Sequence, residues 1–395
     1  MITKVFYTSS ILIADGEVMV VEWIHNEESN TLGHVAQLEL DGQKSVSPQH
    51  ALTLQDLSAI STLGKHAPTD NIVVAGESIS YQTFQGVGKQ AGITDSLMER
   101  LKLKSVSGRI NLVYPRIPSS YNLGETIVQV ITVDDLQASA LAGAQLEAGA
   151  SAIIPPLPNG LKSFSIFERA LERTKIEIQT FRKEKEIVGF IPKTDHLDLI
   201  PQMIKEYVKN DVSIFAIDFS GSCLPRALIR TTVRAIREAK KIKKKNEPSE
   251  KHYYLHVFDV AASLKSVQGA APITDILTHA YGVDSTSGVM WGGGKLERGK
   301  LRYFNMADYG AYRIGNTKEF GIAIPFDVPD NPVNAYKSLR AHRILDYTKD
   351  CKGNITERIS SGDESKGYAA YLNSKDRAKK EVRTVLSDIK EIRAV

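Results

Sequence analysis

Short apolar runs alternate with longer, charged helical patterns through most of this chain, and that alternation constrains the fold more than any other feature. Three strand-and-helix pairs show it best: 187–191 with 197–209, 212–219 with 226–244, and 253–260 with 273–281. Strands that are apolar on both faces indicate a parallel sheet covered by helices. Repeated this often, the pattern predicts an α/β fold and favours a (β/α)8 TIM-like barrel over an open sheet.

The two ends of the chain differ from this middle part. Residues 1–108 have the pattern of short strands and turns, so we expect an N-terminal β-rich elaboration that leads into the barrel. The main part of the barrel should occupy 109–330, and 331–395 should form a C-terminal helical extension. The overall composition, 42% hydrophobic and 24% charged over 395 residues, is that of a globular protein and excludes disordered, collagen-like and coiled-coil classes.

Two local signals stand out in the N-terminal segment. The Asp41-Gly42 dipeptide between apolar runs predicts a hairpin turn. Thr53, with Asp56 three residues later, predicts the capped start of a helix over 53–63.

Charge and cysteine content limit the partners and cofactors. Fifty basic and forty-six acidic residues give a net charge of +4, so an anionic partner must be bound by a local patch. Two cysteines, Cys223 and Cys351, exclude a disulfide scaffold and a four-cysteine metal site. Residues 1–16 lack the apolar region of a signal peptide, and no window offers the roughly 18 apolar residues of a membrane span. We therefore expect a cytoplasmic protein.

The carboxyl ends of the strands are where a barrel of this kind carries its site. Five segments follow the apolar runs: 156–159, 193–195, 218–222, 259–263 and 284–287. Asp218 and Asp284 stand out because each ends an apolar run beside small residues, where a ligand can approach a nucleophile or base closely. Each also fits a helix cap or a turn. If both are functional, they should face one pocket.

A glycine run at 292–294 is the clearest candidate for contact with phosphate. It leads into four basic residues: Lys295, Arg298, Lys300 and Arg302. Backbone amides of such a run can approach a phosphate, although the spacing matches neither a P-loop nor a dinucleotide motif, and a flexible loop on a solvated basic face is equally compatible. A lysine-rich stripe at 240–245 ends a helix, so it should lie at the opposite face of the barrel and contribute less to nucleic-acid binding.

Several segments between Gly33 and Tyr347 occur in the order of known motifs. They are 132–137 (TVDDLQ), 149–154 (GASAII), 253–258 (YYLHVF), 281–285 (YGVDS), 298–304 (RGKLRYF) and 340–345 (RAHRIL). In this order they resemble the tRNA-guanine transglycosylases. The string at 283–287 (VDSTS) looks like the divergent branch of that superfamily that acts on DNA.

The resemblance implies a (β/α)8 barrel that exchanges guanine for a 7-deazaguanine base in tRNA or DNA through a covalent aspartyl-sugar intermediate. With a three-residue deletion, Asp284 matches the nucleophile; without it, Asp284 is structural and Ser287 takes that position. Ser80 stands where the family has a motif aspartate, and Glu77 nearby is the expected substitute.

We therefore expect Asp284 and Glu77 to be catalytic. The expected substrate-binding residues are Lys193, Asp218, Ser220, Gly221, Ser222 and Ser285. Lys295, Arg298, Lys300 and Arg302 are expected to bind nucleic acid. The family's zinc cysteines are absent and only His342 matches its zinc histidine, so we expect no zinc and no other cofactor. The implied partners are tRNA or DNA, a guanine or 7-deazaguanine base, and a second copy or a paralogue in a dimer, with no membrane.

Two other functions stay open. Loss of the motif aspartate and of the zinc cysteines favours a catalytically degenerate subunit that binds nucleic acid or pairs with an active paralogue. An unrelated barrel lyase acting on a small phosphorylated substrate is the third possibility.

Overall fold

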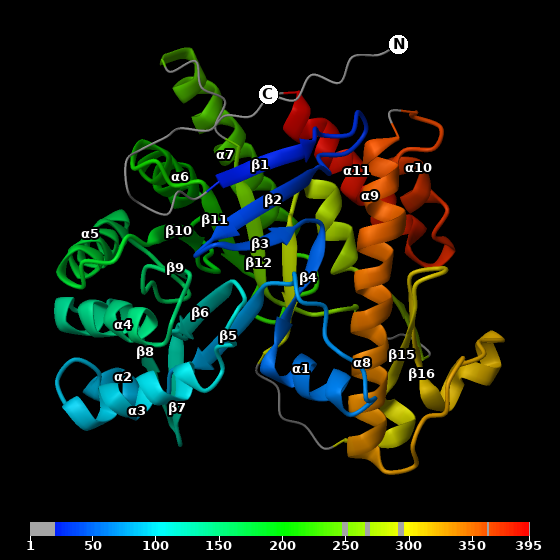
Figure 1. Cartoon of the computed structure of the whole chain (residues 1–395), viewed down its shortest axis with the longest axis horizontal. Helices are drawn as coiled ribbons and strands as arrows, with labels where there is room; N and C mark the ends of the chain where they lie inside the picture. Colours follow the sequence, from blue (N-terminus) through cyan, green and yellow to red (C-terminus); the bar gives the residue numbers. More distant parts are fainter. Residues whose placement is uncertain (1–19, 247–251, 265–268, 291–295, 362, 395) are drawn as a thin grey trace.

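The computed structural model describes residues 20–246, 252–264, 269–290, 296–361 and 363–394. Eight parallel strands pair in chain order, and the last pairs with the first, so the predicted (β/α)8 barrel is confirmed (Figure 1). The strands are β4 (Gln49–Thr53), β5 (Val73–Ser78), β6 (Asn111–Arg116), β9 (Ala152–Ile153), β10 (Glu186–Ile191), β11 (Ile214–Asp218), β12 (Tyr254–Val260) and β14 (Ser285–Gly288). We call the carboxyl ends of these strands the mouth and their amino ends the floor.

Helices cover the outside of the barrel. They are α1 (Leu54–Ser61), α2 (Tyr81–Gly86), α3 (Ala91–Lys102), α4 (Asp135–Glu147), α5 (Phe164–Thr180), α6 (Leu199–Lys209), α7 (Arg226–Asn246), the 3-10 helix η1 (Ile276–Tyr281) and α8 (Pro332–Asp350). α1 begins as predicted, because Thr53 and Asp56 form a reciprocal capping box. Among the helices in the described ranges, none is long and apolar enough to cross a membrane.

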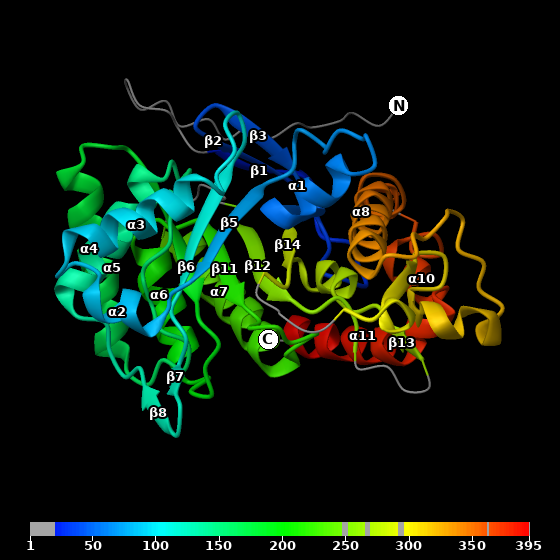
Figure 2. The same ribbon diagram turned by 90° about the horizontal axis from the view of Figure 1, so that it is seen from below.

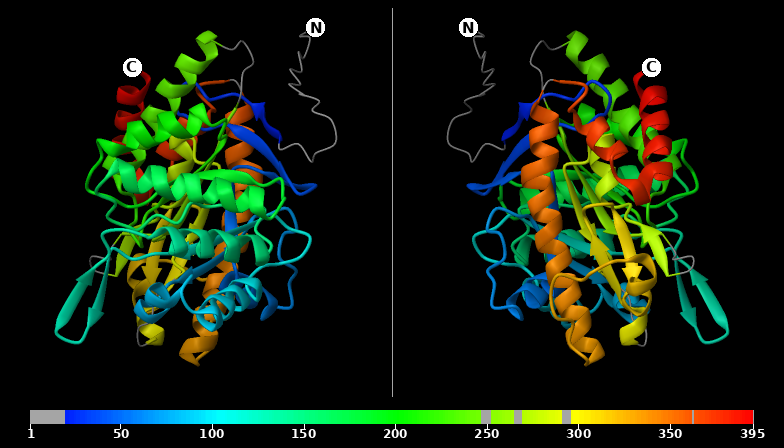
Figure 3. Two further views of the ribbon diagram at one scale, coloured as in Figure 1. Left: turned by 90° about the vertical axis from the view of Figure 1, so that its left-hand side faces the viewer. Right: turned by 90° about the vertical axis from the view of Figure 1, so that its right-hand side faces the viewer.

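Two antiparallel elements lie on opposite sides of the barrel (Figure 2). A sheet of β1 (Val20–His25), β2 (Val35–Leu40) and β3 (Gln43–Val46) covers the floor, where Trp23 Nε1 donates a hydrogen bond to Tyr253 O at 3.1 Å. Its β2–β3 turn is the predicted one, with Asp41 and Gly42 at φ 52° and 69°. On the mouth side, the hairpin of β7 (Ser120–Leu123) and β8 (Thr126–Gln129) projects from the body (Figure 3).

The C-terminal part of the chain packs against one flank of the barrel, and it contains the helices expected there. Its elements are β13 (Ala270–Pro272), η2 (Arg298–Lys300), β15 (Arg302–Asn305), β16 (Gly310–Arg313), η3 (Ile314–Phe320), a π-helical turn η4 (Cys351–Ile355), α9 (Thr356–Ser360), α10 (Tyr368–Asn373), η5 (Asp376–Ala378) and α11 (Lys379–Arg393). Buried Asp388 of α11 accepts hydrogen bonds from Arg226 Nε at 2.8 Å and from Tyr281 Oη at 2.5 Å. These bonds fix the last helix to α7 and η1.

Aromatic side chains fill the inside of the barrel. The rings of Tyr114 and Phe258 stack with centroids 4.5 Å apart, and Phe190 lies 5.3 Å from Tyr114. Their strands, β6, β12 and β10, are not neighbours, so these rings meet only in the interior. The interior is thus a packed core, so a ligand can reach polar groups of the barrel only at the mouth or at the floor.

Candidate active site at the barrel mouth

The two aspartates that the sequence brings together lie at opposite ends of the barrel. Asp218 is the last residue of β11, at the mouth. Asp284 precedes β14 at the floor. Its N–H donates to the oxygen of Leu255 near the start of β12, and its C=O accepts from Gln49 N at the start of β4. The expectation that both carboxylates face one pocket is therefore wrong.

Asp284 was placed at the wrong end of the barrel because the wrong residues were taken as the strand. The run 281–283 looks like the end of an apolar strand, but it closes η1, and Gly282 at φ 80° turns the chain there. The strand itself is Ser285–Gly288, and its hydroxyl side chains Ser285, Thr286 and Ser287 are wholly buried. A strand of small polar residues carries no apolar pattern.

Asp284 serves as a buried hydrogen-bond acceptor at the floor. Its Oδ1 accepts from Ser47 Oγ at 2.6 Å and lies 3.1 Å from His34 Nε2, and its Oδ2 accepts from Leu255 N at 2.7 Å. Burial alone would lower the pKa of His34, but the adjacent Asp284 carboxylate outweighs it and holds that pKa above the usual value. Trp23 stacks on His34 at 4.0 Å.

Glu77 lies on the outer face of its strand. Its Oε1 is 3.1 Å from Arg100 Nε, and its Oε2 pairs with Lys104 Nζ. Arg100 lies in the last turn of α3, and Lys104 lies just beyond the end of that helix. Val74 packs in the main hydrophobic core, whereas Ala75 packs with residues of α3 outside the barrel. Side chains alternate along a strand, so Glu77 points outward like Ala75. Glu77 therefore does not reach the mouth.

Asp218 is the centre of a polar network at the mouth. Its Oδ2 accepts from Tyr114 Oη at 2.7 Å, from Asn159 Nδ2 at 2.8 Å and from Ser220 Oγ at 3.2 Å. Its Oδ1 accepts from Ser220 N at 2.6 Å. Four donors thus hold a carboxylate that has no exposed surface, and the burial and the Asp218 charge raise the pKa of Tyr114, so the tyrosine stays a donor.

Asp259 supplies a second carboxylate beside the first. It lies in β12, the neighbour of β11, and its Oδ1 accepts from Met290 N at 3.1 Å. Burial, together with the nearby charge of Asp218, raises the pKa of Asp259 to about 6. Arg116 joins the two, with Nε 3.6 Å from Asp218 Oδ2 and Nη1 3.7 Å from Asp259 Oδ2. We call Tyr114, Arg116, Asn159, Asp218, Ser220 and Asp259 the mouth cluster.

Three further expected substrate-binding residues border the mouth cluster. Lys193 is exposed at the end of β10, and its Nζ lies 3.2 Å from Ser222 Oγ. Ser222 and Gly221 follow Ser220 on the loop between β11 and α7. Ser285 does not join them: it lies inside the barrel near the floor, where its Oγ is 2.7 Å from His256 Nδ1.

Three of the four expected nucleic-acid-binding residues make contacts within the chain. Arg298 donates to the backbone oxygens of Val328 and Pro329, both at 2.9 Å, and Lys300 pairs with Glu297 at 2.8 Å. Arg302 donates to Leu264 O at 2.9 Å. The fourth, Lys295, and the glycine run at 292–294 lie outside the described residues. Arg298 and Arg302 thus hold loops together rather than forming an open rim.

Metal-binding side chains do not gather in the part of the chain that the structure describes: it contains no cluster of three or more His, Cys, Asp or Glu. At the mouth, the Arg116 guanidinium occupies the space between the two carboxylates. His342 stacks on Phe326 at 3.6 Å.

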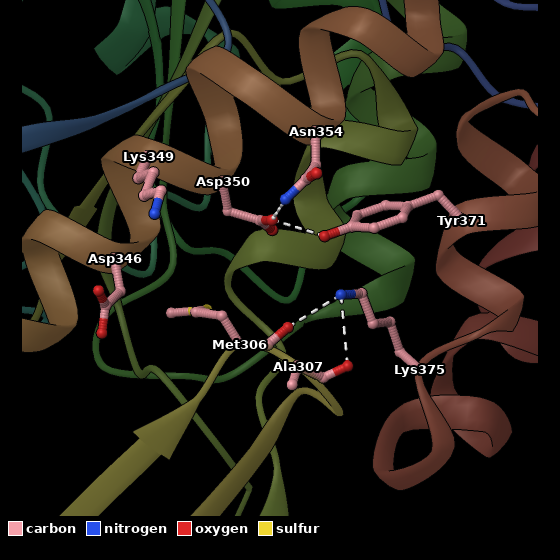
Figure 4. A pocket seen from close by; sticks show the side chains of 8 residues that line it. All are labelled: Met306, Ala307, Asp346, Lys349, Asp350, Asn354, Tyr371 and Lys375. Carbon is pink, nitrogen blue, oxygen red and sulfur yellow. Dashed lines mark hydrogen bonds between the residues drawn. The ribbon is translucent and has the colours of Figure 1, made fainter. Parts of the chain in front are cut away.

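A cavity of about 320 Å³ lies on another flank, between α8, α10 and the end of β15 (Figure 4). Its buried groups bond within the chain. Asp350 accepts from Asn354 Nδ2 at 2.6 Å and from Tyr371 Oη at 2.5 Å. Lys375 Nζ donates to Met306 O at 2.9 Å and lies 4.1 Å from the centre of the Tyr371 ring. These contacts attach α10 to the barrel.

Sequence reasoning found part of the mouth cluster. Asn159 and Asp259 fall in segments expected at strand ends, although neither was singled out. Tyr114 and Arg116 were missed, because a tyrosine and an arginine two residues apart carry no motif. The alternation of β6 is the signal that places both side chains on the inner face.

Comparison with known proteins does not assign this site. No protein-family model matches the chain, and no curated protein matches it significantly.

Proposed function

We propose that the chain acts at the mouth, exchanging guanine for a 7-deazaguanine base in tRNA or DNA, with Asp218 and Asp259 in place of Asp284 and Glu77. The observation that carries this proposal is the pair of carboxylates on neighbouring strand ends. One is held by four donors, while burial raises the pKa of the other to about 6. Two carboxyl groups kept in different environments are the usual basis of paired acid and nucleophile roles.

The chemistry follows from these environments. An Asp218 oxygen bonds to C1′ of the target nucleotide while the C1′–N9 bond breaks and its electron pair leaves with guanine. Asp259 donates its proton to the departing base. The incoming base then gives its N9 proton to the Asp259 carboxylate, and N9 displaces Asp218 from C1′. Arg116 permits two carboxylates to lie close together by placing a positive charge between them.

Incorporation of labelled 7-deazaguanine and guanine into bulk tRNA and bulk DNA tests the proposal. We expect Asp259→Asn to lower the rate of incorporation by about 100-fold or more, the usual contribution of a general acid or base. Asp70→Asn is the matched control, since Asp70 is an exposed carboxylate that pairs with Lys352. Equal rates for the wild type and Asp259→Asn would refute the role of Asp259.

A degenerate, nucleic-acid-binding subunit is the second candidate, and a specific observation favours it. Asp218 has no exposed surface and its oxygens already accept four hydrogen bonds from the chain itself. A nucleophile needs an open approach to the sugar, which the wholly buried Asp218 gains only if the groups around it move. Binding of tRNA or DNA without incorporation of either base, alone or with a paralogue, would support this candidate.

A further inference from the structure

The loop between β11 and α7 presents two hydroxyl groups beside two cationic side chains at the mouth. Ser220 Oγ accepts from Arg116 Nη2 at 2.8 Å, and Ser222 Oγ lies 3.2 Å from Lys193 Nζ. Arg116 is 20% exposed at its side chain and Lys193 is exposed. Gly221 stands between the two serines. Apart from its two chain neighbours, no described residue has an atom within 4 Å of the position that a Cβ would take on it.

Backbone hydrogen bonds fix these groups in place. Gly221 N donates to Asp259 O at 2.8 Å, and Ser220, at φ 48°, donates its N–H to Asp218. The backbone of Lys193 is held by two hydrogen bonds. Its N–H donates to Asn159 Oδ1 at 3.3 Å, and its C=O accepts from Gly160 N at 2.6 Å. A site that is ordered before the ligand arrives loses less entropy on binding.

From this arrangement we infer a phosphate-binding site formed by the side chains of Arg116 and Lys193 and the hydroxyl of Ser222, which follows Gly221. Guanidinium and ammonium groups together with hydroxyl donors are the groups that bind phosphate oxygens. The inference deepens the proposed function, because it names the part of the substrate that the mouth holds.

The neighbouring carboxylates do not oppose a phosphate here. Asp218 is buried and surrounded by donors, so its charge is already compensated. Asp259 is also buried, and its Oδ2 lies 3.7 Å from Arg116 Nη1. Arg298 and Arg302 are bonded to loop backbone oxygens and Lys300 pairs with Glu297, whereas Arg116 and Lys193 lie beside the serine hydroxyls at the mouth.

The phosphate has two possible sources, the backbone of a nucleic acid and a small phosphate monoester, and the experiment separates them. Anisotropy across a salt series measures binding of labelled 12-nucleotide single strands of DNA and RNA. Calorimetry measures binding of ribose 5-phosphate. The variants are Lys193→Ala and Ser222→Ala, with Lys352→Ala as the matched surface-lysine control. Thermal unfolding verifies that each variant is folded.

We expect Lys193→Ala to weaken binding of a strand about 10-fold and to reduce the salt slope by about 0.7, the loss of one phosphate contact. Ser222→Ala should weaken binding less, and Lys352→Ala not at all. If only ribose 5-phosphate binds, and Lys193→Ala weakens it, the phosphate site stands and the base-exchange proposal fails. If strands bind through Lys193 but no base is incorporated, the site stands as part of a degenerate subunit. If Lys193→Ala and the wild type bind both probes equally, or neither binds, the inference is overturned.

Discussion

Each end of the barrel holds a fully buried aspartate, yet the two serve different purposes. Asp284 at the floor accepts from a serine and a backbone amide and pairs with His34, beneath a stacked tryptophan. Asp218 at the mouth accepts four hydrogen bonds, and its network continues to Asp259 and to the partly exposed Arg116.

Burial of a carboxylate is therefore no sign of function by itself. The floor compensates its charge with a histidine and closes the site, which is the arrangement of a structural group. The mouth keeps a second carboxylate whose burial raises its pKa to about 6, an arrangement that costs stability. Where a fold retains a costly arrangement, function is the better explanation.

Replacing Asp284 should produce the largest loss of stability. In Asp284→Asn one oxygen becomes a donor that faces either Ser47 or Leu255, and the negative charge paired with His34 is lost. Removing one member of a buried pair costs about 3 kcal/mol or more. Urea unfolding followed by circular dichroism at pH 7 measures it, with Asp70→Asn as the control. A stable variant that has lost activity would return Asp284 to the catalytic role.

Replacing Asp259 at the mouth by asparagine should leave the stability unchanged or raise it. The folded-state pKa of Asp259, about 6, lies above the ordinary value of 3.8, so the folded protein binds a proton more tightly than the unfolded chain. This group therefore stabilises the fold at low pH, and that stabilisation is lost as the pH rises from about 4 to about 6. At pH 7.5 we expect Asp259→Asn to be as stable as the wild type or more stable, by about 1 kcal/mol.

Unfolding of both proteins at pH 4 and at pH 7.5 provides the measurement. The stability advantage of Asp259→Asn should shrink at pH 4. An asparagine variant that is less stable than the wild type by the same amount at both pH values would show that the mouth, like the floor, is built for stability.

His34 should make the floor sensitive to pH with a smaller effect. Its pKa is raised by Asp284 despite burial, so its contribution is fully present below the unfolded-state value of about 6.5 and is lost as the pH rises through the folded-state value. In His34→Gln the decline of stability above pH 6.5 should be weaker than in the wild type. The effect is smaller because burial and the Asp284 charge oppose each other. Parallel declines in both proteins would assign the pH dependence to another group.

The barrel was predictable because its signals are patterns of residues close together in the sequence. Parallel strands buried on both faces, the Thr53–Asp56 capping box and the Asp41-Gly42 turn each involve residues close in sequence, and all three appear in the structure. Asp218 was found for the same reason, since it ends an apolar run.

The partners of Asp218 could not be predicted in this way. Tyr114 lies 104 positions before it and Asn159 lies 59 before it, and closure of the barrel alone brings them together. Asp284 was assigned to the wrong end because β14 consists of two serines, a threonine and a glycine. It has no apolar pattern, so the apolar residues before it were taken as the strand.

Replacing Glu77 should have the smallest effect on stability, and it tests most directly whether the mouth carries the chemistry. Its carboxylate pairs with Arg100 and Lys104, whose side chains are 40% and 28% exposed, so solvent screens both interactions. Such partly exposed pairs contribute up to about 1 kcal/mol, and Glu77→Gln keeps the shape and one acceptor oxygen. We expect a loss of about 0.5 kcal/mol and unchanged incorporation of labelled base, because the side chain faces α3 and not the mouth. Denaturation and incorporation are measured on one preparation, beside Asp259→Asn. If Glu77→Gln abolished incorporation while Asp259→Asn did not, the outer face of β5 would carry the chemistry, and the mouth cluster would be structural like the floor.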